Sequence, residues 1–181
     1  MSKVVVFLAE GFEEIEGLTV VDMLRRAGIT VITASIQSAK EVKGAHNITV
    51  LADELVGDVD YKQVDMVVLP GGMPGTLHLG ACKKVTDTVQ EFFKAGKEVA
   101  AICAAPSVLG DLGILQGKEA TCYPGFEERL TGAKTTKEPV VSDGNVTTSR
   151  GMGTAILFGA KLIEKLAGKE KAQEILDSII Y

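Results

Sequence analysis

The segment Val4–Ala9 constrains the fold most strongly, because it is an uninterrupted run of six apolar residues that ends at Glu10. A strand with one face in water alternates polar and apolar residues, whereas a strand covered on both faces is apolar throughout. Asp65–Leu69 has the same buried character, and Glu98–Ile102 is also typical of a strand. The sequence therefore predicts a layered fold with strands inside it.

Longer amphipathic segments separate these strands. The predicted helices are Glu13–Ala27, Val85–Ala95, a segment that follows Cys103 and ends near Leu112, Gly153–Leu166 and Lys169–Ile180. Further strands are predicted at Ile29–Ser35, between Lys43 and Leu55 as short half-exposed pieces, and at Lys118–Cys122, Val140–Asp143 and Val146–Ser149. Asp143-Gly144-Asn145 is typical of a hairpin turn. Strands that alternate with helices predict an α/β fold with a mainly parallel sheet.

Composition limits what such a chain can do. Its 181 residues predict one domain, 1–181, and 46% of them are hydrophobic, which is enough for a buried core. A net charge of −5, few aromatic residues and no long Lys/Arg run argue against nucleic acid as the ligand. No apolar run approaches the ~18 residues of a membrane span. Three cysteines without a C-x-x-C pair favour a reducing, cytoplasmic setting.

Sites in open parallel sheets lie beyond the carboxyl ends of the strands. This rule selects four segments, and each contains unusual residues. The four are Glu10–Glu16, Pro70–Thr76, Cys103–Pro106 and Ser149–Thr154.

Cys103 joins a strand directly to a helix, with Ala101 two positions before it and Ala105 two positions after it. A tight turn of this kind needs small neighbours and lifts one side chain above the sheet edge. A thiol near a helix N-terminus is also expected to favour the thiolate. The alternative is a small buried hydrophobic residue, the commonest fate of a free cysteine. Cys82 and Cys122 have no comparable setting.

Three glutamates crowd the turn after the first strand. We interpret Glu13 and Glu14 as charges that stabilise the N-terminus of the following helix. Glu16 lies between Ile15 and Gly17, and an acid there is expected to point toward the sheet edge. Burial would raise its pKa, so that it could stay protonated and donate to a thiolate.

The glycine-rich segments do not match a phosphate loop. Gly71–Thr76 lacks the Gly-Lys-Ser/Thr ending, and Ile156 stands where G-x-G-x-x-G needs a third glycine. These glycines either bring backbone N–H groups to a reaction site or form plain turns. His46 and His78 are far apart in sequence and no Cys/His spacing matches a zinc motif, so we expect no metal.

Four segments together resemble the ThiJ/PfpI superfamily, most closely its DJ-one-like branch around the Parkinson-associated deglycase. They occur in family order and are Leu8–Glu16, Asp65–Gly72, Ala101–Pro106 and Thr148–Thr154. The resemblance extends from residue 3 to about residue 170. It implies a flavodoxin-like three-layer sandwich, a homodimer and no cofactor.

The resemblance also implies roles for particular residues. Cys103 is the reactive cysteine, Glu16 is the acid hydrogen-bonded to it, and the N–H groups of Gly72 and Ala104 face a substrate oxyanion. Three positions depart from the pattern. Tyr123 stands where several relatives have the His of a His-Pro pair, Ala104 replaces the His of protease-like members, and Met152 stands where some relatives have Pro. No peptidase triad is therefore expected, and Tyr123 and Met152 are expected to shape the pocket.

Two functions follow from the resemblance. The first is a cofactor-independent glyoxalase or deglycase that acts on small 2-oxoaldehydes such as methylglyoxal, or on their adducts. The second is a non-enzymatic oxidative-stress sensor or chaperone in which Cys103 is oxidised to sulfinic acid. Both need Cys103 and Glu16. A flavodoxin-like nucleotide binder is a third hypothesis, which the failed glycine spacings disfavour.

Overall fold

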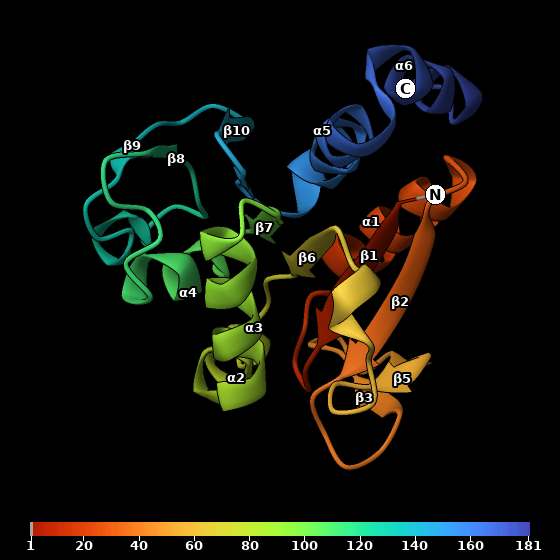
Figure 1. The fold of residues 1–181 in the computed structure, drawn as a ribbon, viewed down its shortest axis with the longest axis vertical. Helices are drawn as coiled ribbons and strands as arrows, with labels where there is room; N and C mark the ends of the chain where they lie inside the picture. The colour runs from red at the N-terminus through yellow and green to blue at the C-terminus, as the bar shows by residue number, and fades with distance from the viewer. Residues whose placement is uncertain (1) are drawn as a thin grey trace.

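One large sheet lies between two layers of helices in the computed structural model, which describes residues 2–181 (Figure 1). The sheet has seven strands in the order β10-β11-β7-β6-β1-β2-β5. All neighbouring strands are parallel except β10 and β11. The predicted α/β sandwich with a mainly parallel sheet is confirmed.

The elements of the main sheet begin and end close to the predicted bounds. Its strands are β1 (Lys3–Leu8), β2 (Thr30–Ser35), β5 (Glu54–Leu55), β6 (Met66–Leu69), β7 (Glu98–Ile102), β10 (Val140–Asp143) and β11 (Val146–Ser149). Two small two-stranded sheets lie outside it: β3 (Glu41–Lys43) with β4 (Thr49–Leu51), and β8 (Glu119–Ala120) with β9 (Lys134–Thr135). The expected hairpin is present, since Asp143 pairs with Val146 and Gly144 has φ 61°.

The two helical layers bury opposite faces of the strands. Val4, Val6 and Leu8 of β1 belong to one buried cluster, whereas Val5 and Phe7 belong to the other. The first cluster includes residues of α1 (Glu14–Arg26), α5 (Ala155–Ala167) and α6 (Lys169–Ser178). The second includes residues of α2 (Gly75–Ala81), α3 (Lys83–Lys94) and α4 (Pro106–Asp111). The apolar run in β1 therefore faces helices on both sides.

Some predicted bounds were wrong. Helix α2 was not predicted, because Pro74-Gly75 at its start suggests a turn and no side chain caps it. Lys118–Cys122 contains only the two-residue strand β8, which pairs with β9 rather than with the main sheet. Helix α4 begins at Pro106, three residues after Cys103, and Met152–Thr154 form a 3-10 turn before α5.

Three 3-10 turns complete the structure, at Tyr61–Gln63, Glu127–Arg129 and Met152–Thr154. Among residues 2–181, no helix is long and apolar enough to cross a bilayer.

Candidate active site

Cys103 occupies a strained turn at the carboxyl end of β7. Its φ is 66°, in the left-handed region that non-glycine residues rarely adopt. Two hydrogen bonds hold the turn: the Cys103 N–H donates to the Ser149 carbonyl over 3.0 Å, and its carbonyl accepts from the Tyr123 N–H over 2.8 Å. The neighbouring segments therefore fix the backbone of Cys103, as is common where backbone strain persists at functional sites.

Gly71, which follows β6, lets a thiol and a carboxyl group come together. A Cβ atom at Gly71 would lie 2.5 Å from both the Cβ of Cys103 and the Oε2 of Glu16. The Gly71 N–H instead donates to Oε2 of Glu16 over 3.0 Å. Glu16 itself is on the first turn of α1, with 1% of its surface exposed. A side chain at position 71 would thus separate the two groups.

Glu16 and Cys103 interact electrostatically. Burial raises the pKa of Glu16 to about 7, although hydrogen bonds from Cys103 and the Gly71 N–H lower it in part. Burial, followed by the charge of an ionised Glu16, raises the pKa of Cys103 to about 12. The backbone N–H groups of Ala104 and Gly72 oppose this rise.

The raised pKa of Cys103 differs from our expectation of a thiolate stabilised by a helix N-terminus. The helix begins three residues too late, and the Glu16 carboxylate lies beside the sulfur instead. Near neutral pH Glu16 is half protonated, and the pair can pass a proton from the thiol to the carboxyl group.

A pocket of about 670 Å³ opens above this pair. All four segments selected from the sequence contribute to its lining, through Glu13, Glu16, Gly72, Met73, Cys103, Ala104 and residues 150–154. Tyr123 and Met152 also line it, and both side chains are more than half exposed. The other two cysteines do not line it: Cys122 is buried and Cys82 is half-buried at the end of α2.

His46 is a pocket residue that the sequence did not reveal. It lies in the turn between β3 and β4, which folds over the start of α1: the Ala45 N–H donates to the Phe12 carbonyl over 2.8 Å. A signal for it exists, because this turn follows the carboxyl end of β2 and so belongs to the functional edge of the sheet. The spacing of the two histidines in the sequence carries no such signal.

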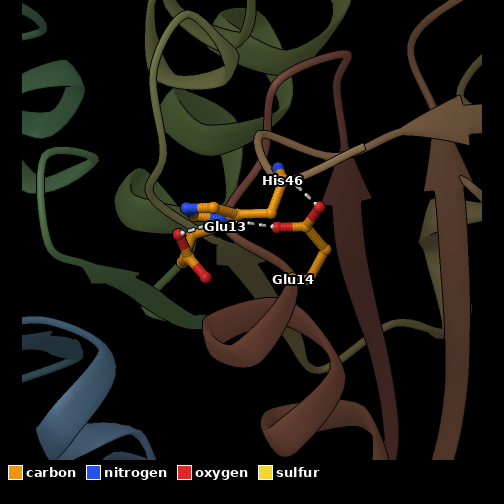
Figure 2. A group of neighbouring side chains, drawn as sticks. All are labelled: Glu13, Glu14 and His46. Atoms are coloured by element: carbon orange, nitrogen blue, oxygen red, sulfur yellow. Dashed lines mark hydrogen bonds and ion pairs between the residues drawn. The ribbon is translucent and has the colours of Figure 1, made fainter. Parts of the chain in front are cut away.

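Glu13, Glu14 and His46 form a cluster at the rim of the pocket (Figure 2). The Nδ1 atom of His46 lies 3.0 Å from Glu14 and 3.3 Å from Glu13. Glu14 also accepts the N–H groups of His46 and Ile48, over 2.8 and 3.3 Å. Although the potential ligand atoms lie within 4.8 Å of one another, we interpret the cluster as an ion-paired hydrogen-bond network and assign no metal to it.

Both helix-start glutamates lie where the sequence predicts. Glu13 caps α1, because its side chain accepts from the Ile15 N–H over 3.4 Å. Glu14 is in the first turn of α1, and 3% of its surface is exposed. Its carboxylate also holds the His46 turn, a role that the sequence did not indicate.

Together, the fold and the site define a class: an α/β sandwich in which one inner strand, β7, leads into a strained cysteine beside a buried acid. The DJ-1/PfpI family model matches residues 2–165, and the chain belongs to this family. The resemblance found in the sequence is confirmed.

Several relatives match over almost the whole chain. The chain is 41% identical to protein dj-1beta of Drosophila melanogaster, over 99% of this chain and 98% of that protein. It is 34% identical to the glutathione-independent glyoxalase DJR-1.2 of Caenorhabditis elegans, over 97% and 94% of the two chains. The structure of oxidized Toxoplasma gondii DJ-1 superposes on this chain with a TM-score of 0.96 at 36% sequence identity. The match covers 100% of this chain and 99% of that chain. By contrast, the chain spans only 41% of the length of protein DJ-1 homolog B of Arabidopsis thaliana.

Proposed function

We propose that this chain is a cofactor-independent glyoxalase that converts 2-oxoaldehydes such as methylglyoxal to 2-hydroxy acids. The observation that carries the proposal is the contact of Cys103 with Glu16, whose pKa is about 7, at the base of an open pocket. A group that titrates near the working pH can both accept and return a proton. Similarity to the nematode relative, a glutathione-independent glyoxalase by name, also supports the proposal.

The reaction follows from the two side chains. Glu16 takes the proton of Cys103, and the thiolate adds to the aldehyde carbon. Glu16 gives this proton to the resulting alkoxide, which completes the hemithioacetal and leaves Glu16 as a carboxylate. Glu16 then removes the hydrogen from that carbon, and an enediol forms. Return of the proton to the neighbouring carbon gives a thioester, which water hydrolyses to the hydroxy acid and free Cys103. The N–H groups of Gly72 and Ala104 face the sulfur of Cys103, which supports a role for them in stabilising an oxyanion beside it. In an adduct with an amine, the Cys103 thiolate would form the bond to the same carbon while the carbon–nitrogen bond breaks and the amine leaves with a proton from Glu16. This gives the same hemithioacetal and is the deglycase activity.

The test is lactate production from methylglyoxal by purified protein. Cys103→Ser should abolish turnover, whereas Cys82→Ser, the matched control outside the pocket, should retain it. Equal lactate production by Cys103→Ser and wild type would contradict the proposal.

A second candidate function is a peroxide sensor. Here each of two equivalents of hydrogen peroxide gives one oxygen atom to the sulfur of Cys103 and is reduced to water. Cys103 thereby becomes sulfinic acid. Glu16 and the N–H groups of Gly72 and Ala104 surround the sulfur and would hold the sulfinate oxygens. Mild peroxide should add the mass of two oxygens to wild type. If Glu16→Ala gives the same product at the same rate, Glu16 does not hold the sulfinate.

We also propose a homodimer in a reducing, cytoplasmic setting. The dimer is proposed from family membership, and the location is supported by three cysteines that are all free. Light scattering at micromolar concentration should give twice the chain mass, and a monomer mass would refute the dimer.

A further inference from the structure

The proposed reaction needs more proton transfers than Glu16 alone can make easily. Glu16 moves a hydrogen between two carbon atoms, but each of these carbons also carries an oxygen. One oxygen must gain a proton when the enediol forms, and the other must lose a proton when the thioester forms. A second group that both donates and accepts near neutral pH would serve both oxygens.

We propose that His46 is this second acid–base residue and that Glu14 positions it. The inference rests on the proposed glyoxalase function. His46 lines the same pocket as Cys103 and Glu16, and 68% of its side chain is exposed. Substrate in the pocket can therefore reach the imidazole.

The ring of His46 is held by one of its two nitrogens. Nδ1 lies 3.0 Å from the Glu14 carboxylate and 3.3 Å from Glu13, so that it donates its hydrogen to a carboxylate. Nε2 has no hydrogen-bond partner within residues 2–181. Since the carboxylates keep a proton on Nδ1, Nε2 is the nitrogen that gains and loses a proton. A carboxylate orients a catalytic imidazole in the same way in Ser-His-Asp triads.

Glu14 is suited to a positioning role because it is buried and fully engaged. Its Oε1 accepts the backbone N–H groups of His46 and Ile48, while its Oε2 faces the ring. One carboxylate thus fixes both the backbone and the imidazole of His46. Gly44 makes this packing possible, since a Cβ atom there would lie 2.3 Å from the Glu14 carboxyl group.

The charges around His46 favour its protonated form. The groups that face it directly are the carboxylates of Glu13 and Glu14, and the hydrogen bond with Glu14 is the main cause of its raised pKa. The other titratable or charged groups lining the pocket are Glu16, Cys103, Tyr123 and Arg150. A ring that is protonated before the reaction can give its Nε2 proton to one oxygen and then take a proton back from the other.

The proton transfers balance. When Glu16 removes the carbon-bound hydrogen, the imidazolium gives its Nε2 proton to the ketone oxygen, which becomes the second hydroxyl of the enediol. When Glu16 delivers its proton to the neighbouring carbon, the former ketone carbon, neutral His46 takes the proton of the hydroxyl on the sulfur-bearing carbon. Both residues then regain their initial protonation states, and no oxidant or reductant is needed.

His46→Asn tests this assignment, because an Asn amide can still donate to Glu14 but has no equivalent of Nε2. We expect kcat for methylglyoxal to fall by roughly 10²-fold or more, with a much smaller change in KM. The alkaline limb of the kcat–pH profile, which reports loss of the imidazolium, should disappear. His78→Asn is the matched control, since His78 is on α2 and does not line this pocket.

Glu14→Gln tests the positioning role through the kcat–pH profile, which would not change if Glu14 only stabilised the fold. It removes the charge that raises the pKa of His46, so the alkaline limb should shift to lower pH. If His46→Asn fails to fold, the position of this limb decides: an unshifted limb overturns the proposal.

The outcomes separate the two proposals. Wild-type kcat and an unchanged pH profile in His46→Asn, with turnover still dependent on Cys103, overturn the role of His46 and leave the glyoxalase function standing. If turnover of methylglyoxal by the wild-type protein does not depend on Cys103, both the glyoxalase function and the role of His46 are overturned.

Discussion

Glu14 and Glu16 are two residues apart on α1 and are equally hidden from water, yet their pKa values move in opposite directions. Burial raises the pKa of both. At Glu14, backbone N–H groups and the His46 ring more than offset this effect, so the pKa is lowered. At Glu16, hydrogen bonds from one backbone N–H and from the thiol are too few to offset the effect of burial, and the pKa rises to about 7. The donors that replace water, rather than burial itself, decide which carboxyl group keeps its charge.

The largest expected effect comes from removing the acid whose pKa is raised. Glu16→Gln keeps the shape of the side chain but cannot accept a proton. We expect kcat/KM for methylglyoxal to fall by roughly 10²–10⁴, the usual contribution of one general acid–base group. Steady-state kinetics with lactate as the readout would check this. Activity at the wild-type level would show that the buried acid has no part in the reaction.

The two acids should give opposite pH dependences of stability. The folded-state pKa of Glu16 is raised. Its contribution to the free energy of unfolding is therefore fully present below about pH 4.5 and is lost as the pH rises through about 7. The loss amounts to about 3 kcal/mol. Glu14 has a lowered pKa, so its contribution is present above about 4.5 and is lost as pH falls further.

Urea unfolding measures this difference. Between pH 5 and pH 8, wild type should lose free energy of unfolding relative to Glu16→Gln. Below pH 4.5, wild type should lose free energy of unfolding relative to Glu14→Gln. Parallel stability curves for wild type and both variants would contradict the electrostatic comparison.

Removing Glu14 altogether should destabilise the fold to a smaller extent. Glu14→Ala leaves the N–H groups of His46 and Ile48 without their acceptor, at a cost of about 1–3 kcal/mol. Glu13→Ala is the matched control, since among residues 2–181 the Glu13 side chain accepts one long hydrogen bond, 3.4 Å from the Ile15 N–H, besides its ion pair with His46. An equal loss of stability in both variants would mean that Glu14 has no special role in holding the turn.

The smallest expected effect concerns Tyr123. A phenol donates a hydrogen bond but is a poor base at neutral pH, so Tyr123→His would add an acid–base group to the pocket. Since His46 already brings an imidazole to the pocket, we expect this variant to raise kcat/KM less than tenfold. A rise of about a hundredfold would indicate that His46 does not serve the reaction.

The sequence predicted the features that depend on local pattern. The apolar run of β1 indicated a sheet covered on both sides, and each of the four segments selected by the carboxyl-end rule contributes to the pocket. His46 was missed because only the packing of the β3–β4 turn against α1 brings it to the pocket. The pKa of Cys103 was misjudged for a similar reason, since it depends on the side chain of Glu16, far away in the sequence.

Gly71 has a consequence for directed evolution. Every other amino acid would place a Cβ atom 2.5 Å from the two reacting side chains, so a randomised library at this position would consist almost entirely of inactive clones. Met73, Tyr123 and Met152 also border the pocket, but about half of each side chain is in water, so substitutions there can alter substrate preference without moving Cys103. Diversity in such a library belongs at these three rim positions.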